Sequence, residues 1–417
     1  MKKIYLLASA LFILAGQQLY SQCGGRYQAD IFSTIDVSTV QYGSNVDLNS
    51  NPVNLDMDIY QPQGDTETER PLIILAHGGS FSAGDKGDPD QVFFATELAK
   101  KGYVCATINY RLAPSAFSLI AEETTTKVVL MAIQDGRAAV RYFRQDAATS
   151  NTYKIDPDQI FVGGTSAGGI LGINLSYIDD ISELSTQWQT WANEIGGIEG
   201  TSGNPGYCSR SNGTFGFAGG VADTNWIDGN DVPWYGSHNY DALTVQYGYG
   251  QPLNGFTPVF LHGSGSLKSR LTTVGTYFHL DEYAGGDHPP FQSSAQIMAD
   301  NKDSLAVFLY NILDCNPSNL KKPTQKTCVS VSVAEVNPNT LDANIYPNPF
   351  NDEINVSIKE ISGTTISVIN ALGTVVLTQQ ANSYINNISL SHLAKGIYTV
   401  KVSSQEGKNH TQLVVKQ

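Results

Sequence analysis

Short apolar runs alternate with helical patterns between residue 31 and about residue 314, and this alternation restricts the fold more than any other feature of the sequence. The buried-strand signals lie at residues 72–76, 104–109, 160–164, 216–221, 232–237, 258–262 and 276–283. The helical patterns lie at residues 91–101, 124–145, 167–175 and 293–313. Strand–helix–strand alternation favours a mostly parallel, doubly wound sheet with helices on both faces, so we expect an α/β fold here.

Three segments depart from this rhythm. Residues 177–210 hold two tryptophans and a Gly/Ser/Asn-rich stretch, and we interpret them as a cap inserted over the carboxyl edge of the sheet. Residues 316–343 have the composition of a linker. Residues 344–417 show only short strand signals separated by turn residues, which predict a small all-β sandwich. The α/β domain is thus expected at residues 22–315.

Residues 1–21 have the pattern of an export signal. Two lysines precede an apolar run at residues 4–15 that is too short to span a bilayer, and small or polar residues follow. We expect cleavage after Ser21. A lipoprotein modified at Cys23 is disfavoured because Gln22 stands where a small residue is needed. We therefore expect a secreted or cell-surface protein that passes through the periplasm and has no transmembrane anchor in its mature form.

The balance of charge excludes one class of partner. The chain has 39 acidic against 25 basic residues, a net charge of −14, and no basic patch outside Lys321–Lys322. Nucleic-acid binding needs a cluster of Lys and Arg, so we expect no nucleic-acid partner.

The five cysteines are an odd number, so at least one thiol stays free in a compartment that permits disulfides. Cys105 lies in an apolar run and is expected to be a buried free thiol. Cys23, Cys315 and Cys328 lie near domain edges and are the favoured disulfide partners, with the connectivity open. No Cys/His spacing resembles a zinc site, and we expect neither a metal nor a cofactor.

The residues Gly164-Thr165-Ser166-Ala167-Gly168 form a Gly-x-Ser-x-Gly motif directly between a predicted strand and a predicted helix. A nucleophilic serine needs this setting, because small glycines let the flanking backbones approach closely around a tight strand-to-helix turn. The helix start then faces a developing anion. A purely structural glycine turn is the alternative, and we predict Ser166 as a nucleophile.

Such a nucleophile needs amide donors for the oxyanion that it creates. His77-Gly78-Gly79 follows the first strong buried strand, and loops of this kind supply backbone amides. We predict an oxyanion hole formed by the amides of Gly78, Gly79 and Ala167, against the alternative of a plain glycine turn.

The general base is expected to be a histidine after the last strand of the sheet. His288 follows the strand signal at 276–283 and precedes the closing helix. The other candidates are His238, His262 and His279, of which His279 lies inside the strand signal and His262 ends an earlier one. We predict His288.

The acid is harder to choose. The segment after the strand signal at 258–262 contains no carboxylate as far as Arg270. The strand signal at 232–237 is followed by His238 and, three residues later, by Asp241. We predict Asp241 from this loop position and from the order of the triad, with Asp223 and Asp228 as alternatives that could instead cap turns.

These residues resemble the α/β-hydrolase carboxylesterase family, including its hormone-sensitive-lipase and feruloyl-esterase branches. The matching segments, in family order, are His77–Gly79, Asn109–Pro114, Asp135–Val140, Ile155–Ile160 and Gly164–Gly169. The resemblance implies the order Ser, Asp, His, which Ser166, Asp241 and His288 reproduce. The acid region departs from the family, because His-Asn-Tyr-Asp replaces the usual His-Gly-Thr-x-Asp. We read Arg111 and Asp135 as a structural salt bridge beneath the site.

Residues 344–417 resemble the C-terminal sorting domain of type IX secretion in Gram-negative bacteria. The resemblance rests on Tyr346–Phe350, Ile369–Gly373, Leu393–Tyr398 and Leu413–Lys416. It implies translocation across the outer membrane by the type IX machinery, followed by release or surface attachment. A carbohydrate-binding sandwich is the alternative, but this segment has no Trp for a sugar platform.

The resulting hypothesis is a secreted serine carboxylic-ester hydrolase that acts through an acyl-enzyme on small or polysaccharide-linked esters. Acetyl and feruloyl groups of polysaccharides are the substrates that this setting suggests. A serine peptidase of the same fold and a non-catalytic surface protein that binds carbohydrate are the alternatives. The four tryptophans, Trp188, Trp191, Trp226 and Trp234, are candidates for an aromatic pocket or for the core.

Overall fold

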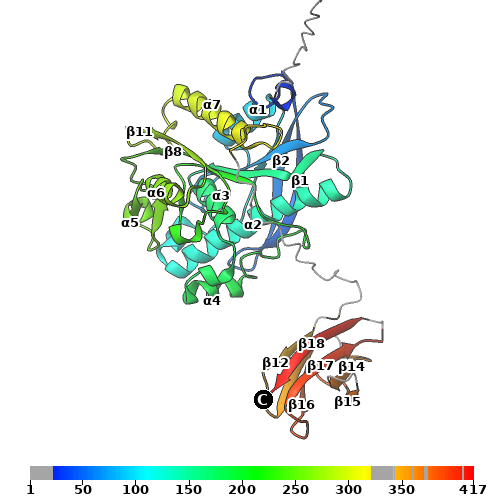
Figure 1. The fold of residues 1–417 in the computed structure, drawn as a ribbon. Helices are drawn as coiled ribbons and strands as arrows, with labels where there is room; N and C mark the ends of the chain where they lie inside the picture. Colours follow the sequence, from blue (N-terminus) through cyan, green and yellow to red (C-terminus); the bar gives the residue numbers. More distant parts are fainter. Residues whose placement is uncertain (1–21, 321–340, 342, 359–360, 371–373, 406–407) are drawn as a thin grey trace, which may run out of the picture. The chain divides into compact units, whose positions relative to one another are not determined.

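A computed structural model describes residues 22–320, 341, 343–358, 361–370, 374–405 and 408–417 of the 417-residue chain (Figure 1). The chain divides into two compact units, Met1–Val331 and Ser332–Gln417. The predicted signal peptide, most of the predicted linker and Cys328 lie outside the described residues. The two units are treated separately below.

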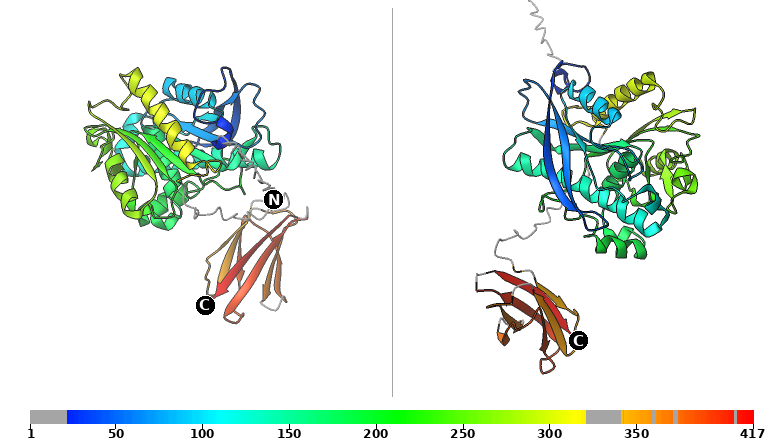
Figure 2. Two further views of the ribbon diagram at one scale, coloured as in Figure 1. Left: turned by 45° about the horizontal axis from the view of Figure 1, so that its top comes forward. Right: turned by 180° about the vertical axis from the view of Figure 1, so that it is seen from behind.

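The first unit is built on an eight-stranded sheet with the order β1-β2-β4-β3-β5-β6-β8-β11. The six strands from β4 to β11 in this order run parallel to one another. At the other edge, β1 and β2 form an antiparallel hairpin, and β2 pairs antiparallel with β4 (Figure 2). Its strands are β1 (Ile35–Val46), β2 (Pro52–Pro62), β3 (Arg70–Ala76), β4 (Val104–Ile108), β5 (Ile155–Thr165), β6 (Gly213–Phe217), β8 (Trp234–Asn239) and β11 (Phe278–Tyr283).

Helices cover both faces of this sheet, as Figure 1 shows. One face packs against α2, α3 and α6, and the other against α1 and α7. The α-helices are α1 (Pro89–Ala99), α2 (Glu122–Ala148), α3 (Ala167–Tyr177), α4 (Thr186–Glu194), α5 (Pro252–Gly255), α6 (Ser264–Val274) and α7 (Ala295–Ile312). The 3₁₀ helices are η1 (Gln22–Gly25), η2 (Ala116–Ile120), η3 (Ile181–Glu183) and η4 (Thr224–Trp226).

The central strands are buried on both faces because helices cover them, and this explains why their sequences are continuously apolar. Every residue of β3 and β4 is buried. The amphipathic helix α2 turns its apolar side toward α3 and the sheet. The predicted doubly wound, mostly parallel sheet is therefore confirmed.

A second, smaller sheet contains residues from two of the predicted strand signals. It has the order β7-β10-β9 and consists of β7 (Gly220–Val221), β9 (Tyr249–Gly250) and β10 (Leu261–Gly263). The strand signal at 216–221 is thus divided between β6 and β7. The signal at 258–262 belongs to β10, outside the main sheet. The strand next to β11 in the main sheet is instead β8.

The second unit is a small β-sandwich. One sheet has the order β12-β13-β16 and the other β15-β14-β17-β18, and alternate side chains of both fill one core. Its strands are β12 (Ala343–Tyr346), β13 (Glu353–Ile358), β14 (Thr365–Asn370), β15 (Val375–Gln380), β16 (Ile385–Ser389), β17 (Gly396–Ser403) and β18 (Asn409–Lys416). The predicted all-β sandwich is confirmed.

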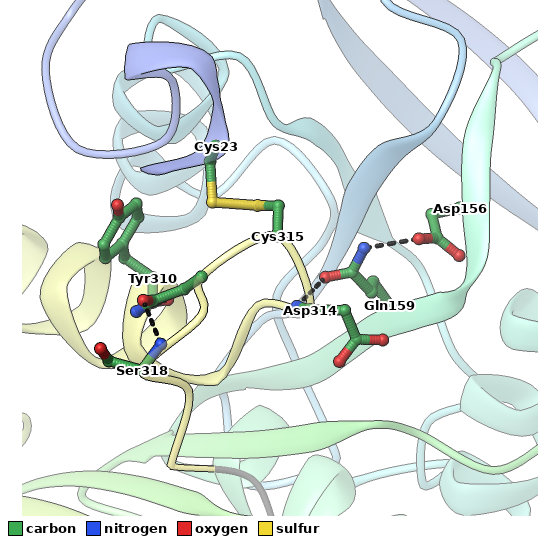
Figure 3. Close-up of a disulfide and its surroundings, with 8 residues drawn as sticks. Cys23, Asp156, Gln159, Tyr310, Asp314, Cys315 and Ser318 are labelled. Atoms are coloured by element: carbon green, nitrogen blue, oxygen red, sulfur yellow. Dashed lines mark hydrogen bonds between the residues drawn. A yellow bond between two sulfur atoms is a disulfide. The ribbon is translucent and has the colours of Figure 1, made fainter. Parts of the chain in front are cut away.

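A disulfide between Cys23 and Cys315 joins η1 to the segment that follows α7 (Figure 3). Beside it, Gln159 of β5 donates to Asp156 and accepts from the backbone amide of Asp314. Cys105 is a buried free thiol, as predicted. Cys208, which was not among the favoured partners, is also disulfide-bonded.

Candidate active site

Ser166 stands at the turn between β5 and α3 with a backbone conformation that side chains rarely adopt. Its φ of 51° and ψ of −110° are strained for a residue other than glycine, and such strain concentrates at functional sites. The Ser166 amide donates to the carbonyl of Phe217 on β6 at 2.8 Å, which fixes the turn against the neighbouring strand. The predicted strand–turn–helix setting of Ser166 is present.

The two motif glycines are required by close backbone contact. A Cβ at Gly164, whose φ is +155°, would lie 1.9 Å from the carbonyl oxygen of Ala76 in β3. A Cβ at Gly168 would lie at the same distance from the same oxygen. Any side chain at either position would push the turn away from β3, so the motif spacing follows from the packing of this turn.

His288 lies against Ser166. Its Nε2 is 2.7 Å from the Ser166 Oγ, and Ser166 is only 9% exposed. Burial, together with the smaller effect of the nearby His238, lowers the pKa of His288 from 6.5 to about 4. The imidazole is therefore neutral at pH 7 and can accept a proton from the hydroxyl.

Asp241 contacts the loop that carries His288 rather than the imidazole ring. Strands β8 and β11 pair in parallel with Asn239 opposite Tyr283, so the segments after both strands emerge side by side. The Asp241 carboxylate accepts from the amides of Gly285 and Gly286 at 3.1 to 3.3 Å. The buried Nδ1 of His288 has no hydrogen-bond partner among the described residues.

The alternative acids lie in turns. The Asp223 side chain accepts from the amide of Asn225 and caps η4. The Asp228 carboxylate accepts from the amide of Asn230. Both interactions are the turn-capping roles that the sequence left open for these residues.

The other histidines have different partners. His238 is buried, with its ring nitrogens 2.8 Å from the Ser264 hydroxyl and from the Val245 carbonyl. His279 pairs with Asp281 on β11. His262 lies on β10 and stacks near the ring of Tyr249. Only His288 lies within hydrogen-bonding distance of Ser166 among the described histidines.

The loop His77-Gly78-Gly79 follows β3 and passes directly beside Ser166. A Cβ on Gly78 would lie 3.7 Å from the Ser166 Cβ. The Tyr110 hydroxyl donates to the His77 carbonyl at 2.8 Å, and the His77 and Tyr110 rings stack with centroids 4.3 Å apart. These two contacts hold the loop in place, a role of Tyr110 that sequence reasoning missed.

The amides predicted to form the oxyanion hole are unoccupied by protein acceptors. Within the described ranges, the N–H groups of Gly78, Gly79 and Ala167 have no hydrogen-bond partner. Ala167 is the first residue of α3, where an amide has no acceptor inside the helix. These donors are available to an anion at Ser166.

Asp90 and Gln91 support the turn from outside the motif. The Thr165 hydroxyl donates to Asp90 at 2.6 Å and accepts from the Gln91 amide at 2.8 Å, both at the start of α1. Arg111 and Asp135 form a fully buried salt bridge at 2.8 Å, as predicted. Sequence reasoning missed Asp90 and Gln91, because nothing in their local pattern distinguishes them from ordinary residues of a first helical turn.

An apolar cavity opens at Ser166. It is bounded by η2, α2, α3, η3–α4 and the segment from Thr244 to Leu261, and it includes two of the four tryptophans, Trp188 and Trp226. Trp234 is instead completely buried in the core. The segment predicted as a cap thus contributes Leu184 and Trp188 to the cavity wall.

Two family models match the chain. Residues 57–196 match the family BD-FAE, and residues 344–416 match the secretion system C-terminal sorting domain.

Similar curated proteins match only in part. A quorum-quenching protein, AidA, of Acinetobacter baumannii is 30% identical over 124 residues, which are 30% of this chain and 36% of that protein. Gut esterase 1 of Caenorhabditis briggsae is 29% identical over 102 residues, 24% of this chain and 17% of that protein. The neuroligin-like protein glit-1 of Caenorhabditis elegans is 30% identical over 114 residues, 27% and 14% of the two chains. The chain thus spans between 14% and 36% of the length of these relatives.

Among solved structures, the butyrate-bound esterase 2 of Thermogutta terrifontis is similar with a TM-score of 0.45 and 17% identity. The similarity covers 65% of this chain and 92% of that one.

The fold defines an α/β-hydrolase domain, and a separate secretion domain follows it in the chain. More narrowly, residues 57–196 match the BD-FAE family, and residues 344–416 match a type IX C-terminal sorting domain. The sorting domain directs the protein to the type IX machinery and so to secretion or surface attachment, as predicted. Within the described ranges, no helix has the length and apolar character needed to cross a membrane.

Proposed function

We propose that this protein is a secreted serine carboxylic-ester hydrolase that works through an acyl-enzyme on Ser166. The observation that carries the proposal is the 2.7 Å contact between the Ser166 Oγ and the His288 Nε2 at a strained strand-to-helix turn. A nucleophile and a neutral base within hydrogen-bonding distance are the first requirement of this chemistry. The BD-FAE match and the esterase relatives favour esters as the substrate class.

In the proposed first step, the Ser166 oxygen attacks the ester carbonyl carbon while its proton passes to His288 Nε2. The amides of Gly78, Gly79 and Ala167 then donate to the oxyanion. The C–O bond to the alcohol breaks, and the departing alkoxide takes the proton from His288. Water then attacks the acyl-serine with the help of the same base and releases the carboxylic acid.

Asp241 is the proposed acid of this triad. It follows β8, the strand beside β11, and its carboxylate already binds the amides that precede His288. Catalytic hydrogen bonds are often incomplete in a free enzyme and form in the complex with substrate. In this proposal Asp241 sets the position of the His288 loop and its charge stabilises the imidazolium.

The test is hydrolysis of short p-nitrophenyl esters by Ser166→Ala. Loss of such a nucleophile lowers kcat by about 10⁶-fold in a well-studied serine hydrolase, so we expect activity to fall to background. Ser269→Ala, at an exposed position on α6, is the matched control and should keep the wild-type rate. Hydrolysis by Ser166→Ala at the wild-type rate would refute the proposal.

Intact catalytic side chains favour turnover over a purely adhesive role, because both Ser166 and His288 are present and in contact. Acetyl and feruloyl esters of polysaccharides are the substrates that the sequence suggests. Wild-type protein that binds xylan or pectin without hydrolysing any ester would support the adhesive alternative.

A further inference from the structure

The cavity beside Ser166 has an almost entirely apolar wall. Residues of α2 and α3 supply much of it, and η2, the cap segment, η4, the loop after β3 and the segment before β10 supply the rest. Its main apolar residues are Leu119, Val129, Ile133, Ile170, Leu184 and Trp226.

Several polar side chains in this wall are already hydrogen-bonded to other groups of the protein. Asn174 donates to the carbonyls of Ile170 and Gly220 and accepts from the amide of Ala222. The Thr125 hydroxyl donates to the Leu119 carbonyl at 2.7 Å.

The indole N–H groups of Trp188 and Trp226 donate to Glu122 and to the Glu183 carbonyl. The hydroxyls of Thr126 and Thr257 have no hydrogen-bond partner among the described residues, and each exposes almost no surface. A ligand in this cavity therefore meets hydrocarbon rather than hydrogen-bonding groups.

The position of the cavity relative to His288 shows which half of an ester it can hold. Ser166, Ala167 and Phe81 line the cavity, but His288 does not. The leaving alcohol takes its proton from the base and so departs on the side of His288. The acyl group lies on the opposite side, which is the side of the cavity.

Exposed aromatic side chains continue the apolar surface around the mouth of the cavity. Phe117 on η2 is 77% exposed, and Phe256 after α5 is 40% exposed, and their ring centroids are 6.4 Å apart. Phe260 lines the cavity, is 44% exposed and stacks on Tyr249. These four rings, termed the aromatic rim, carry an apolar surface from the cavity into solvent.

We propose that this cavity binds the acyl group of the substrate and selects a plain hydrocarbon acyl chain over acetyl and feruloyl groups. The proposal rests on the proposed ester-hydrolase function. The cavity offers about 90 Å³ to the centre of a water-sized sphere. Since one water needs about 10–15 Å³ on this measure and a methylene group is of similar size, the cavity suits about six to nine carbons. Acetyl leaves most of it empty, and the phenol of a feruloyl group would meet an almost entirely apolar wall.

The experiment measures kcat/KM for p-nitrophenyl esters from acetate to decanoate with the full chain. Each buried methylene contributes roughly two- to four-fold, so hexanoate should exceed acetate by about 15-fold to 250-fold. Methyl cinnamate should be hydrolysed about tenfold faster than methyl ferulate, because the ferulate hydroxyl would be buried against an almost entirely apolar wall.

Two variants connect this preference to the cavity and its rim. Val129→Phe fills the cavity from α2 and should lower the ratio of hexanoate to acetate kcat/KM about tenfold or more. Phe117→Ser removes the most exposed ring and should lower activity on decanoate more than on hexanoate. Val307→Phe and Val307→Ser, at an exposed position on α7, are the matched controls and should leave both ratios unchanged.

The outcomes separate this proposal from the one on which it rests. A Ser166-dependent activity that peaks at acetate, or that prefers ferulate to cinnamate, overturns the acyl-cavity proposal while ester hydrolysis stands. A preference that follows the alcohol in a series from methyl to hexyl acetate, with no dependence on acyl length, also overturns it. Absence of activity on every ester overturns the proposed function itself.

Discussion

Gly168→Ala tests how closely the nucleophile turn depends on backbone contact with β3. The added Cβ would lie 1.9 Å from the Ala76 carbonyl oxygen, whereas ordinary contact begins at 3.4 Å. The turn or the strand must therefore move by about 1.5 Å. A shift of about 1 Å at a reacting atom lowers rates by roughly 10²-fold.

The expected result is a fall in kcat/KM of about 100-fold or more, which corresponds to roughly 2.7 kcal/mol of lost transition-state stabilisation. Overpacking should also lower the free energy of unfolding by about 1–3 kcal/mol. The assay combines p-nitrophenyl ester kinetics with urea unfolding of the same preparation.

Gly248→Ala is the matched control, because a Cβ at Gly248 meets nothing within 4 Å. It should change neither the kinetics nor the unfolding midpoint. Wild-type kcat/KM in Gly168→Ala, with stability unchanged, would show that the turn tolerates a side chain and would refute this account of the motif.

Three further predictions follow from the site and its support. Asp241→Asn should lower kcat/KM by orders of magnitude while Asp228→Asn leaves it unchanged, and the reverse result would move the acid to Asp228. Burial lowers the pKa of His288 from 6.5 to about 4, so the base loses activity only when protonated, and the acid limb of kcat/KM against pH should lie well below 6.5. His288 should also make the free energy of unfolding rise with pH between about 4 and 6.5, because the unfolded chain binds more protons than the folded chain in that range. An acid limb of kcat/KM at or above pH 6.5 would instead mean that a carboxylate faces the His288 Nδ1. Asp135→Ala breaks a buried ion pair and should lower the free energy of unfolding, measured in urea, by about 3–5 kcal/mol. Asp303→Ala removes the exposed partner of a surface ion pair and should change it by less than about 1 kcal/mol. Equal effects of the two substitutions would contradict the reasoning.

Local signals made the fold and two site residues predictable. Buried parallel strands are continuously apolar, so β3, β4 and β5 were visible as short apolar runs. Ser166 directly follows β5, and His288 lies five residues after β11, so their contact was expected from this order. The hairpin of β1 and β2 gave no clear signal, because β1 is mostly exposed and its apolar residues are few.

The remainder depends on contacts between distant segments. Asp241 was chosen by its loop, but only the structure shows its carboxylate on the amides of Gly285 and Gly286. The cavity combines seven separate segments, so no window of sequence could predict it. The absence of an acid after residue 262 is also explained, because β10 lies in the small sheet and not beside β11.

The disulfide between Cys23 and Cys315 closes a covalent ring around almost the whole of the first unit. A single peptide-bond cut in any loop inside this ring leaves both fragments joined, whereas the sorting domain at residues 344–416 lies outside the ring. The ring can close only in an oxidising compartment, and both the periplasm and the cell surface are of this kind. A hydrolase unit closed in this way is expected to stay in one piece after a nick in one of its loops.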